Sequence, residues 1–395
     1  PYSPEPLPWS TMLSVHEGRH VTQMQFGMTK AQRPLGWFLG EMWNIAASLI
    51  YQGMANIEGD AVIAETALTN SGRGRTADFL NYYKVAFDSG DFRKWSQWRF
   101  MSQRGYSPDH YALGYLTLGG FRYLYDCPMY MNEIYTLASR RPHALTAQYS
   151  VTKKLTGKKY QEAFQEVCDT LHKIWTSEAE ARVPFIPMEP VSSEPRLYTD
   201  YRGTLVADDV LYTIKKGHET APVLVSIDKD GREKVLSRFA YQTGRLKVSR
   251  HLKRLYWSEA SEDERWSLES KSRIRYMNLS GKGKASLTTS QRLLHNPDIN
   301  QENNLIATVE YSADGRSALT VVNGVSGEVS VSVAGPKGVQ LVETAWIGKD
   351  IYATAISDNG YGVYRLHDNR DAYSWECVLG PQPVLVKDFR TYGDE

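Results

Sequence analysis

A repeat of short strand-like segments in the second half of the chain limits the possible folds more than any other feature. Alternating runs rich in Val, Ile, Leu, Tyr and Thr recur about every 45 residues, punctuated by Gly and Asp. Four such runs begin at Leu211-Tyr212, Leu255-Tyr256, Leu305-Ile306 and Ile351-Tyr352. Several short strands per unit are typical of a β-propeller blade, with an all-β sandwich as the alternative.

In each unit a second strand-like run then leads to a polar turn. These runs are Val225–Asp228, Tyr276–Leu279, Leu319–Val321 and Val363–Leu366. The last segment, Leu385–Thr391, looks like the start of a fifth blade. We therefore expect a partial propeller of about four blades plus the start of another. We also expect the chain to be a piece of a longer protein, truncated at its C-terminus.

The first half differs, because its apolar residues recur at helical spacing and strand-like runs are scarce. Helices are expected over 11–26, 37–67, 109–125, 139–150 and 160–175. Ser107 is the expected N-cap of the third helix, with Pro108 in its first turn.

The composition changes between the two halves, where four prolines fall close together. They are Pro184, Pro187, Pro190 and Pro195, and such spacing favours extended backbone. The predicted domains are a helical domain over 1–182 with its upstream part missing, a Pro-rich linker over 183–197 and a propeller over 198–395. The fold class is multidomain α + β, a mainly α-helical domain followed by an all-β propeller.

Charge and hydropathy exclude several classes of partner. Lys+Arg 46 against Asp+Glu 45 leave a net charge of +1, which gives no reason to expect a nucleic-acid partner. No 18-residue apolar run occurs, so no membrane span is expected. The three cysteines are far apart and form no CxxC pair, which supports neither a zinc ribbon nor a disulfide scaffold.

The segment His16-Glu17-Gly18-Arg19-His20 carries the chemistry. Histidines at i and i+4 project from one face of a helix, so their imidazoles can share one ion. Glu17 would lie beside that ion and can take a proton from water. HExxH therefore predicts a Zn²⁺ site, and the alternative is a solvated helix face with two unrelated histidines.

Such a site needs a third protein ligand. Glu58 lies in an expected helix, and the small residues Gly59 and Ala61 would let that helix approach the first one closely. Glu65 is either a partner that orients an imidazole or the ligand itself, and Glu41 is a weaker rival.

The motif resembles that of the gluzincin metallopeptidases, which combine HExxH with a downstream Glu. Glu58-Gly59-Asp60-Ala61 is similar to their EGxA ligand helix. Residues 106–114 are similar to the Tyr-x4-Tyr-x-x-Gly stretch of the aminopeptidase branch. By this resemblance Tyr111 donates a hydrogen bond to the tetrahedral intermediate with Tyr106 beside it, and His110 is a competing donor.

The resemblance covers residues 10 to 180 and has departures. The 37 residues between His20 and Glu58 are about twice the spacing of the aminopeptidase branch, and an inserted segment around residues 30–43 accounts for the difference. No Gly-x-Met-Glu-Asn motif is present, so aminopeptidase activity is not expected.

A gluzincin-like domain joined to TolB-like or WD40-like blades resembles large secreted or periplasmic bacterial proteins. The expected function is a zinc-dependent peptidase with metal ligands His16, His20 and Glu58 and catalytic residues Glu17 and Tyr111. Its substrate is a peptide or protein, and its location is secreted, periplasmic or at the cell surface. The alternative is a non-catalytic protein whose propeller binds a peptide, protein or glycan and which carries a degenerate peptidase domain.

Overall fold

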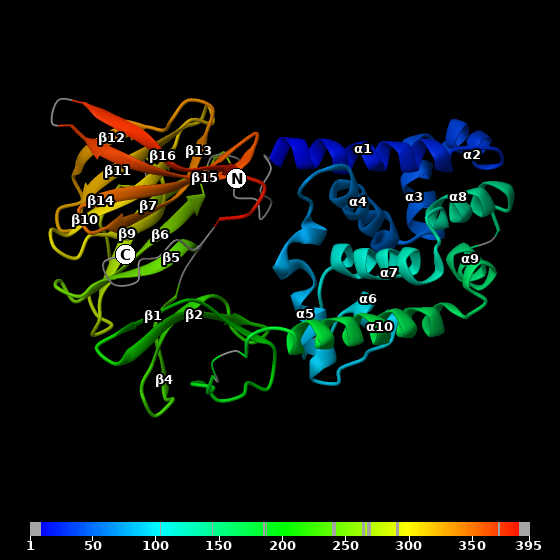
Figure 1. Cartoon of the computed structure of the whole chain (residues 1–395), viewed down its shortest axis with the longest axis horizontal. Helices are drawn as coiled ribbons and strands as arrows, with labels where there is room; N and C mark the ends of the chain where they lie inside the picture. Colours follow the sequence, from blue (N-terminus) through cyan, green and yellow to red (C-terminus); the bar gives the residue numbers. More distant parts are fainter. Residues whose placement is uncertain are drawn as a thin grey trace. The chain divides into compact units, whose positions relative to one another are not determined.

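The computed structural model describes residues 9–102, 104–143, 145–184, 186, 188–238, 242–262, 265–266, 270–289, 292–369 and 372–386. The chain divides into two compact units between residues 187 and 188. The first unit is helical and the second is built from antiparallel strands (Figure 1). None of the described helices combines the length and the hydropathy that a bilayer span requires.

The helices of the first unit follow one another with short connections. They are α1 (Trp9–Gly27), α2 (Gln32–Leu39), α3 (Glu41–Tyr51), α4 (Met54–Leu68), the 3-10 helix η1 (Arg73–Arg75), α5 (Ala77–Asp88), α6 (Trp95–Phe100), α7 (His110–Tyr125), α8 (Tyr130–Arg140), α9 (Ala147–Thr156) and α10 (Tyr160–Glu180).

Three helix predictions need correction. The expected helix over 37–67 is interrupted at Gly40 and Gly53, which adopt positive φ, so it forms parts of α2, α3 and α4. The range 139–150 is no helix as a whole, because α8 ends at Arg140. Pro142 disfavours helical backbone at the residue before it. The N-cap of α7 is Asp109 and not Ser107, since the Asp109 side chain accepts a hydrogen bond from the Ala112 amide at 3.0 Å.

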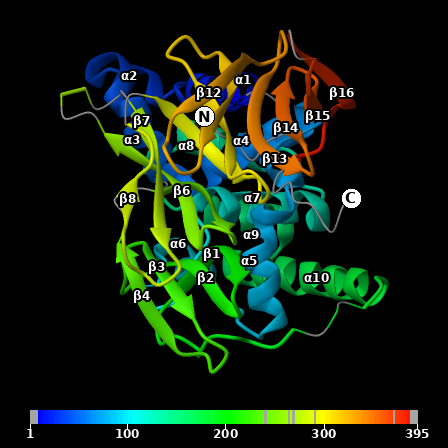
Figure 2. The ribbon, with the colours of Figure 1, turned by 90° about the vertical axis from the view of Figure 1, so that its left-hand side faces the viewer.

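Helix α4 runs against both α1 and α7, and Figures 1 and 2 show α4 and α7 side by side. A Cβ atom on Gly59 would lie 2.2 Å from the backbone of Gly114, and one on Gly114 would lie 1.6 Å from the Ala55 carbonyl oxygen. The two glycines therefore allow a close α4–α7 contact. The expectation that Gly59 serves an approach to α1 is wrong, because its free side faces α7.

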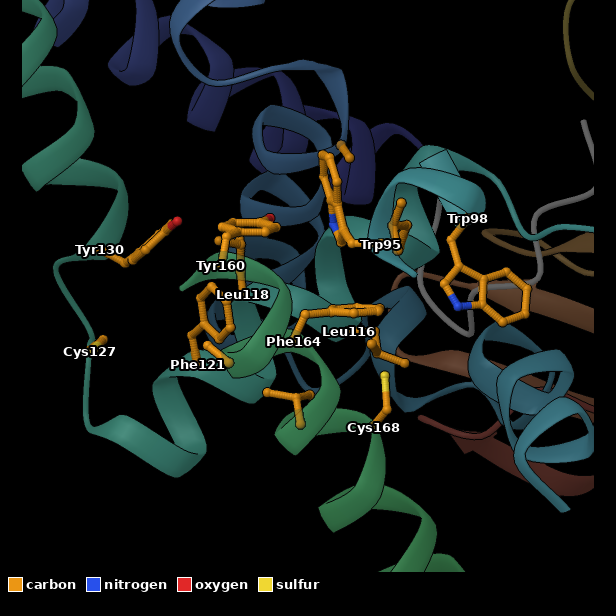
Figure 3. Close-up of a cluster of buried hydrophobic side chains, with 14 of the residues drawn as sticks. Trp95, Trp98, Leu116, Leu118, Phe121, Cys127, Tyr130, Tyr160, Phe164 and Cys168 are labelled. Atoms are coloured by element: carbon orange, nitrogen blue, oxygen red, sulfur yellow. The ribbon is translucent and has the colours of Figure 1, made fainter. Parts of the chain in front are cut away.

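Aromatic side chains form the core of the helical unit (Figure 3). Tyr160, at the start of α10, makes edge contacts with Trp95 at 5.1 Å and Phe121 at 5.7 Å between ring centroids. Phe164 and Cys168 continue the same buried face of α10 one and two turns later. This core fixes α7, and with it one side of α4.

The second unit consists of four sheets, each an antiparallel meander of four consecutive strands. The strands are β1 (Thr199–Ala207), β2 (Val210–Gly217), β3 (Val223–Ile227) and β4 (Glu233–Arg238); β5 (Gln242–Ser249), β6 (Arg254–Glu262), β7 (Ser270–Asn278) and β8 (Ala285–Ser286); β9 (Leu293–Ile299), β10 (Leu305–Tyr311), β11 (Ser317–Asn323) and β12 (Val329–Ala334); β13 (Gln340–Ile347), β14 (Asp350–Ser357), β15 (Gly360–Asp368) and β16 (Tyr373–Gln382).

This arrangement is that of propeller blades, as expected, and not of a two-sheet sandwich. The first strand of each sheet packs against the first strand of the next, from β1 through β5 and β9 to β13. The four repeated dipeptides of the sequence all lie in the second strand of their sheet. Of the expected fifth blade, Leu385 and Val386 carry no strand and residues 387–391 lie outside the described residues.

Candidate metal centre

Helices α1 and α4 bring three donor side chains together. His16 and His20 lie one turn apart on α1, and Glu58 lies in the second turn of α4. The Nε2 atoms of the histidines are 3.2 Å apart, and each is 3.1 Å from Glu58 Oε2. Among the described residues, this is the only group of three or more His, Cys, Asp or Glu side chains close enough together to hold one metal ion.

The donor atoms fit zinc by both type and spacing. A tetrahedral zinc ion with bonds of about 2.0–2.1 Å holds its ligand atoms about 3.3 Å from one another. The three observed distances, 3.1, 3.1 and 3.2 Å, nearly describe one face of such a tetrahedron. Three protein ligands leave a fourth position for water or substrate, as catalytic zinc sites require.

In the metal-free protein His16, His20 and Glu58 shift one another's pKa. Burial acts to lower the pKa of His16, but its hydrogen bonds with Glu58 and Glu65 outweigh burial and raise that pKa to about 9. The hydrogen bond with Glu58 raises the pKa of His20. Burial acts to raise the pKa of Glu58, but the two imidazoles bring it down to about 2. A cation that binds here therefore competes with protons on the histidines.

Gln23 determines which nitrogen of His20 faces the cluster. Its Nε2 donates to the Ile57 carbonyl at 3.1 Å and to Asp60 Oδ2 at 2.9 Å, and both are acceptors only. Its Oε1 must then face His20 Nδ1, at 2.9 Å. Nδ1 therefore carries a hydrogen, so His20 in its neutral form presents the Nε2 lone pair to an ion.

Asp60 holds this amide in place. It is 1% exposed and accepts from Arg19 at 2.7 Å and from Arg122 at 2.8 Å in addition to Gln23. Two cations and an amide compensate the charge of this buried carboxylate, whose burial without partners would destabilise the fold. Asp60 thus links α1, α4 and α7 directly behind the histidine pair.

Glu65 and Arg73 lie behind His16. Glu65 is fully buried and pairs with Arg73 Nε at 2.7 Å. Its Oε2 lies 3.6 Å from His16 Nδ1, and Arg73 NH2 lies 2.9 Å from the same nitrogen. Glu65 is outside the ligand cluster and on the far side of the imidazole, which is the position of a residue that orients the ring. Glu41 is exposed at the first residue of α3, and it is also outside the cluster.

Tyr111 borders the cluster from the first turn of α7. Its ring centroid lies 5.9 Å from that of His16, and the Arg73 guanidinium lies 4.7 Å above the ring. Burial and the charge of Glu58 raise the pKa of the phenol, which therefore remains a hydrogen donor. The ring of His110 lies 4.5 Å from that of Tyr111.

The other two motif residues differ in their surroundings. Glu17 is exposed on α1, and its charge contributes to the raised pKa of Tyr111. Tyr106 packs against Tyr82 with ring centroids 4.5 Å apart.

Five polar residues of this site were given no role by the sequence interpretation. They are Arg19, Gln23, Asp60, Arg73 and Arg122. Gln23 carries a local signal, because it follows His20 by three residues and so shares its helix face. The arginines carry none, since their roles depend on packing between distant helices.

The strand unit contains a cavity of about 230 Å³ among the first strands of its sheets. Lys247 and Asp298 form an ion pair at 2.8 Å in its lining, which also includes Trp346.

No protein-family model and no curated protein matches the sequence. Several solved structures are similar to part of it. The β-propeller domain of the Trilobed protease from Pyrococcus furiosus has 11% identity and a TM-score of 0.35, covering 47% of this chain and 58% of that chain. Pyrococcus horikoshii acylaminoacyl peptidase has 10% identity and a TM-score of 0.34 over 47% and 33%. The putative TolB from Agrobacterium tumefaciens has 10% identity and a TM-score of 0.33 over 44% and 64%. In each case the match spans less than two thirds of the similar chain.

Proposed function

We propose that the helical unit is a zinc-dependent peptidase with His16, His20 and Glu58 as the ligands. The observation that supports this most is the near-equal spacing of 3.1–3.2 Å among three donor atoms of the kinds that zinc prefers. When bound, zinc lowers the pKa of a water to about 7 and polarises a carbonyl oxygen.

The residues around the ligands have the chemistry for the remaining steps. Glu17 takes the proton of the attacking water at a carboxylate oxygen and delivers it to the leaving amine. Its exposure on α1 is consistent with this role, because the base must reach an incoming substrate. Tyr111 donates its phenolic hydrogen to the oxyanion, and its raised pKa keeps that hydrogen in place. A peptide or protein is the proposed substrate, and we propose a secreted, periplasmic or cell-surface location.

The experiment compares zinc content and peptide hydrolysis in Glu17→Gln and Glu58→Gln proteins. Glu17→Gln is expected to retain zinc near one equivalent and to lose hydrolysis of a peptide library. Glu58→Gln is expected to lose both. Glu41→Gln, an exposed glutamate of the same unit, is the matched control and should change neither. Wild-type hydrolysis by Glu17→Gln would refute the mechanism.

The cavity of the strand unit favours one second candidate function. A ligand in this cavity would meet the Lys247–Asp298 pair and Trp346, which offer the charged and aromatic contacts that a peptide- or glycan-binding protein uses. In that case the helical unit would be a degenerate peptidase domain. Purified protein that is folded, free of zinc after zinc exposure and still able to bind peptides or glycans would favour this function.

A further inference from the structure

Helix α2 and the start of α3 expose a group of large apolar side chains. Trp37, Phe38 and Met42 are 88%, 80% and 73% exposed, and Leu35 and Leu39 are also exposed. We call these five residues the apolar tip. They fall in residues 30–43, the segment expected to be an insertion relative to the gluzincin pattern. The proposed catalytic chemistry makes no use of them.

The apolar tip is hydrophobic on several sides. Successive residues of an α-helix point about 100° apart, so Trp37, Phe38 and Leu39 face three directions. Among the described residues of α2, only Gln32 is buried, and it anchors the helix by donating from Nε2 to the Ala138 carbonyl at 3.1 Å. A flat protein surface would cover one side of such a helix and leave the others in water. A fluid medium, by contrast, covers all of these sides at once.

Cations gather at the base of the tip. The connection before α2 lies against the end of α8, since the Ala31 amide donates to the Ser139 carbonyl at 3.1 Å. Four exposed basic side chains come from these two segments: Lys30, Arg33, Arg140 and Arg141. We call them the basic collar. Within the described part of the chain none of the four forms an ion pair, so their charge is available to an external anion.

We propose that the apolar tip inserts into the interface of an anionic lipid bilayer while the basic collar contacts the headgroups. Trp and Phe favour the boundary between headgroups and acyl chains, and exposed Lys and Arg are attracted to an anionic surface. A fluid acyl layer meets the requirement that the tip be covered on several sides. Helix α2 has 8 residues and is too short to span, so in this proposal the tip enters one leaflet only.

Vesicle binding tests this proposal. The full chain is sedimented with vesicles of phosphatidylcholine alone or mixed with phosphatidylglycerol, at low salt and at about 0.5 M salt. We expect at least tenfold stronger binding to the anionic vesicles, and a loss of that preference in high salt. The variant W37S/F38S/L39S and the variant K30E/R33E/R140E/R141E should each bind the anionic vesicles at least tenfold more weakly.

Matched controls separate the surface from general charge and hydropathy. Lys173→Glu, Lys229→Glu, Lys337→Glu and Lys349→Glu together make the same charge change at other exposed sites and should leave binding unchanged. Leu68→Ser removes an exposed apolar side chain at the end of α4 and should also have no effect. Circular dichroism verifies that each variant is folded.

Three results would overturn the proposal. The first is no binding of the wild-type chain to anionic vesicles, and the second is equal binding by the wild type and both multiple variants. The third is a concentration-dependent dimer that W37S/F38S/L39S abolishes while vesicle binding is absent, since a second copy of the chain would then cover the tip.

Discussion

The side-chain oxygen of Gln23 lies 2.9 Å from Nδ1 of His20, and the nitrogen of the same amide donates to Asp60 and to the Ile57 carbonyl. The amide cannot turn over without placing its oxygen against the Asp60 carboxylate and the Ile57 carbonyl, which can only accept hydrogen bonds. One hydrogen-bonded chain thus runs from a buried carboxylate to the lone pair of a proposed metal ligand.

Replacement of Gln23 by Leu should weaken zinc binding about 10- to 100-fold, the range typical of residues that orient a ligating histidine. The affinity of the apoprotein is measured by competition with a chromophoric chelator. Gln25→Leu is the control, because Gln25 lies two residues further along α1 and is exposed. This variant should bind zinc as the wild type does. Equal affinity in the Gln23→Leu and Gln25→Leu proteins would show that the amide does not set the tautomer.

Zinc affinity should rise with pH between about 6.5 and 9. The folded metal-free protein holds a proton on His16 up to a pKa of about 9, and zinc has to displace that proton. The apparent association constant should therefore rise about tenfold per pH unit in this window, and more steeply where the proton on His20 is also displaced. Isothermal titration in two buffers of different ionisation enthalpy measures the proton release directly. A flat profile would mean that the imidazoles are already neutral.

The same shifts determine how the stability of the metal-free protein depends on pH. The pKa of His16 is raised on folding, so its contribution is complete below about 6.5 and is lost as the pH rises through about 9. The pKa of Glu58 is lowered on folding, so its contribution is complete above about 4.5 and is lost as the pH falls toward about 2. Thermal melts of chelator-treated protein should then give the largest contribution from this pair near pH 5 to 6. A His16→Ala/Glu58→Ala protein should lack that maximum.

Local geometry explains why part of this site was open to prediction. Four residues span about one helical turn, so His16 and His20 share a face in any helix. Glu58 was one of three candidate glutamates, beside Glu65 and Glu41, and only the α1–α4 packing brings its carboxylate to the imidazoles. Arg73 lies 57 positions from His16, and nothing in a single sequence reports such a contact.

The fold was predicted unevenly for related reasons. The repeat of about 45 residues is visible in the sequence itself, so the blades could be predicted. Each repeated dipeptide lies in the second strand of its sheet. Helix ends depend on single residues, and the expected helix over 37–67 failed because Gly40 and Gly53 adopt positive φ. The exposure of the apolar side chains of α2 was not predicted, because apolar spacing along a helix does not by itself show what covers the helix.

Replacement of Tyr111 by Phe should lower kcat about 10²- to 10³-fold, the usual effect of removing one oxyanion donor. KM and zinc content should change little, because the ring is retained and the phenol is not a ligand. Steady-state kinetics on a cleaved library peptide measure both constants. Tyr106→Phe is the control, since that ring packs against Tyr82. If His110 is the donor instead, His110→Ala will show the loss and Tyr111→Phe will not.

Replacement of Gly114 by Ala should destabilise the helical unit by about 3 kcal/mol or more, because the new methyl group would meet the Ala55 carbonyl 1.6 Å away. Gly119→Ala on the same helix meets nothing within 4 Å and should be neutral or stabilising by up to about 1 kcal/mol. Denaturant titration compares the two proteins. The clash can be relieved only if α4 moves away from α7, and Glu58 moves with α4. A folded Gly114→Ala protein should therefore also bind zinc more weakly, whereas unchanged zinc affinity would show that the α4–α7 contact does not position Glu58.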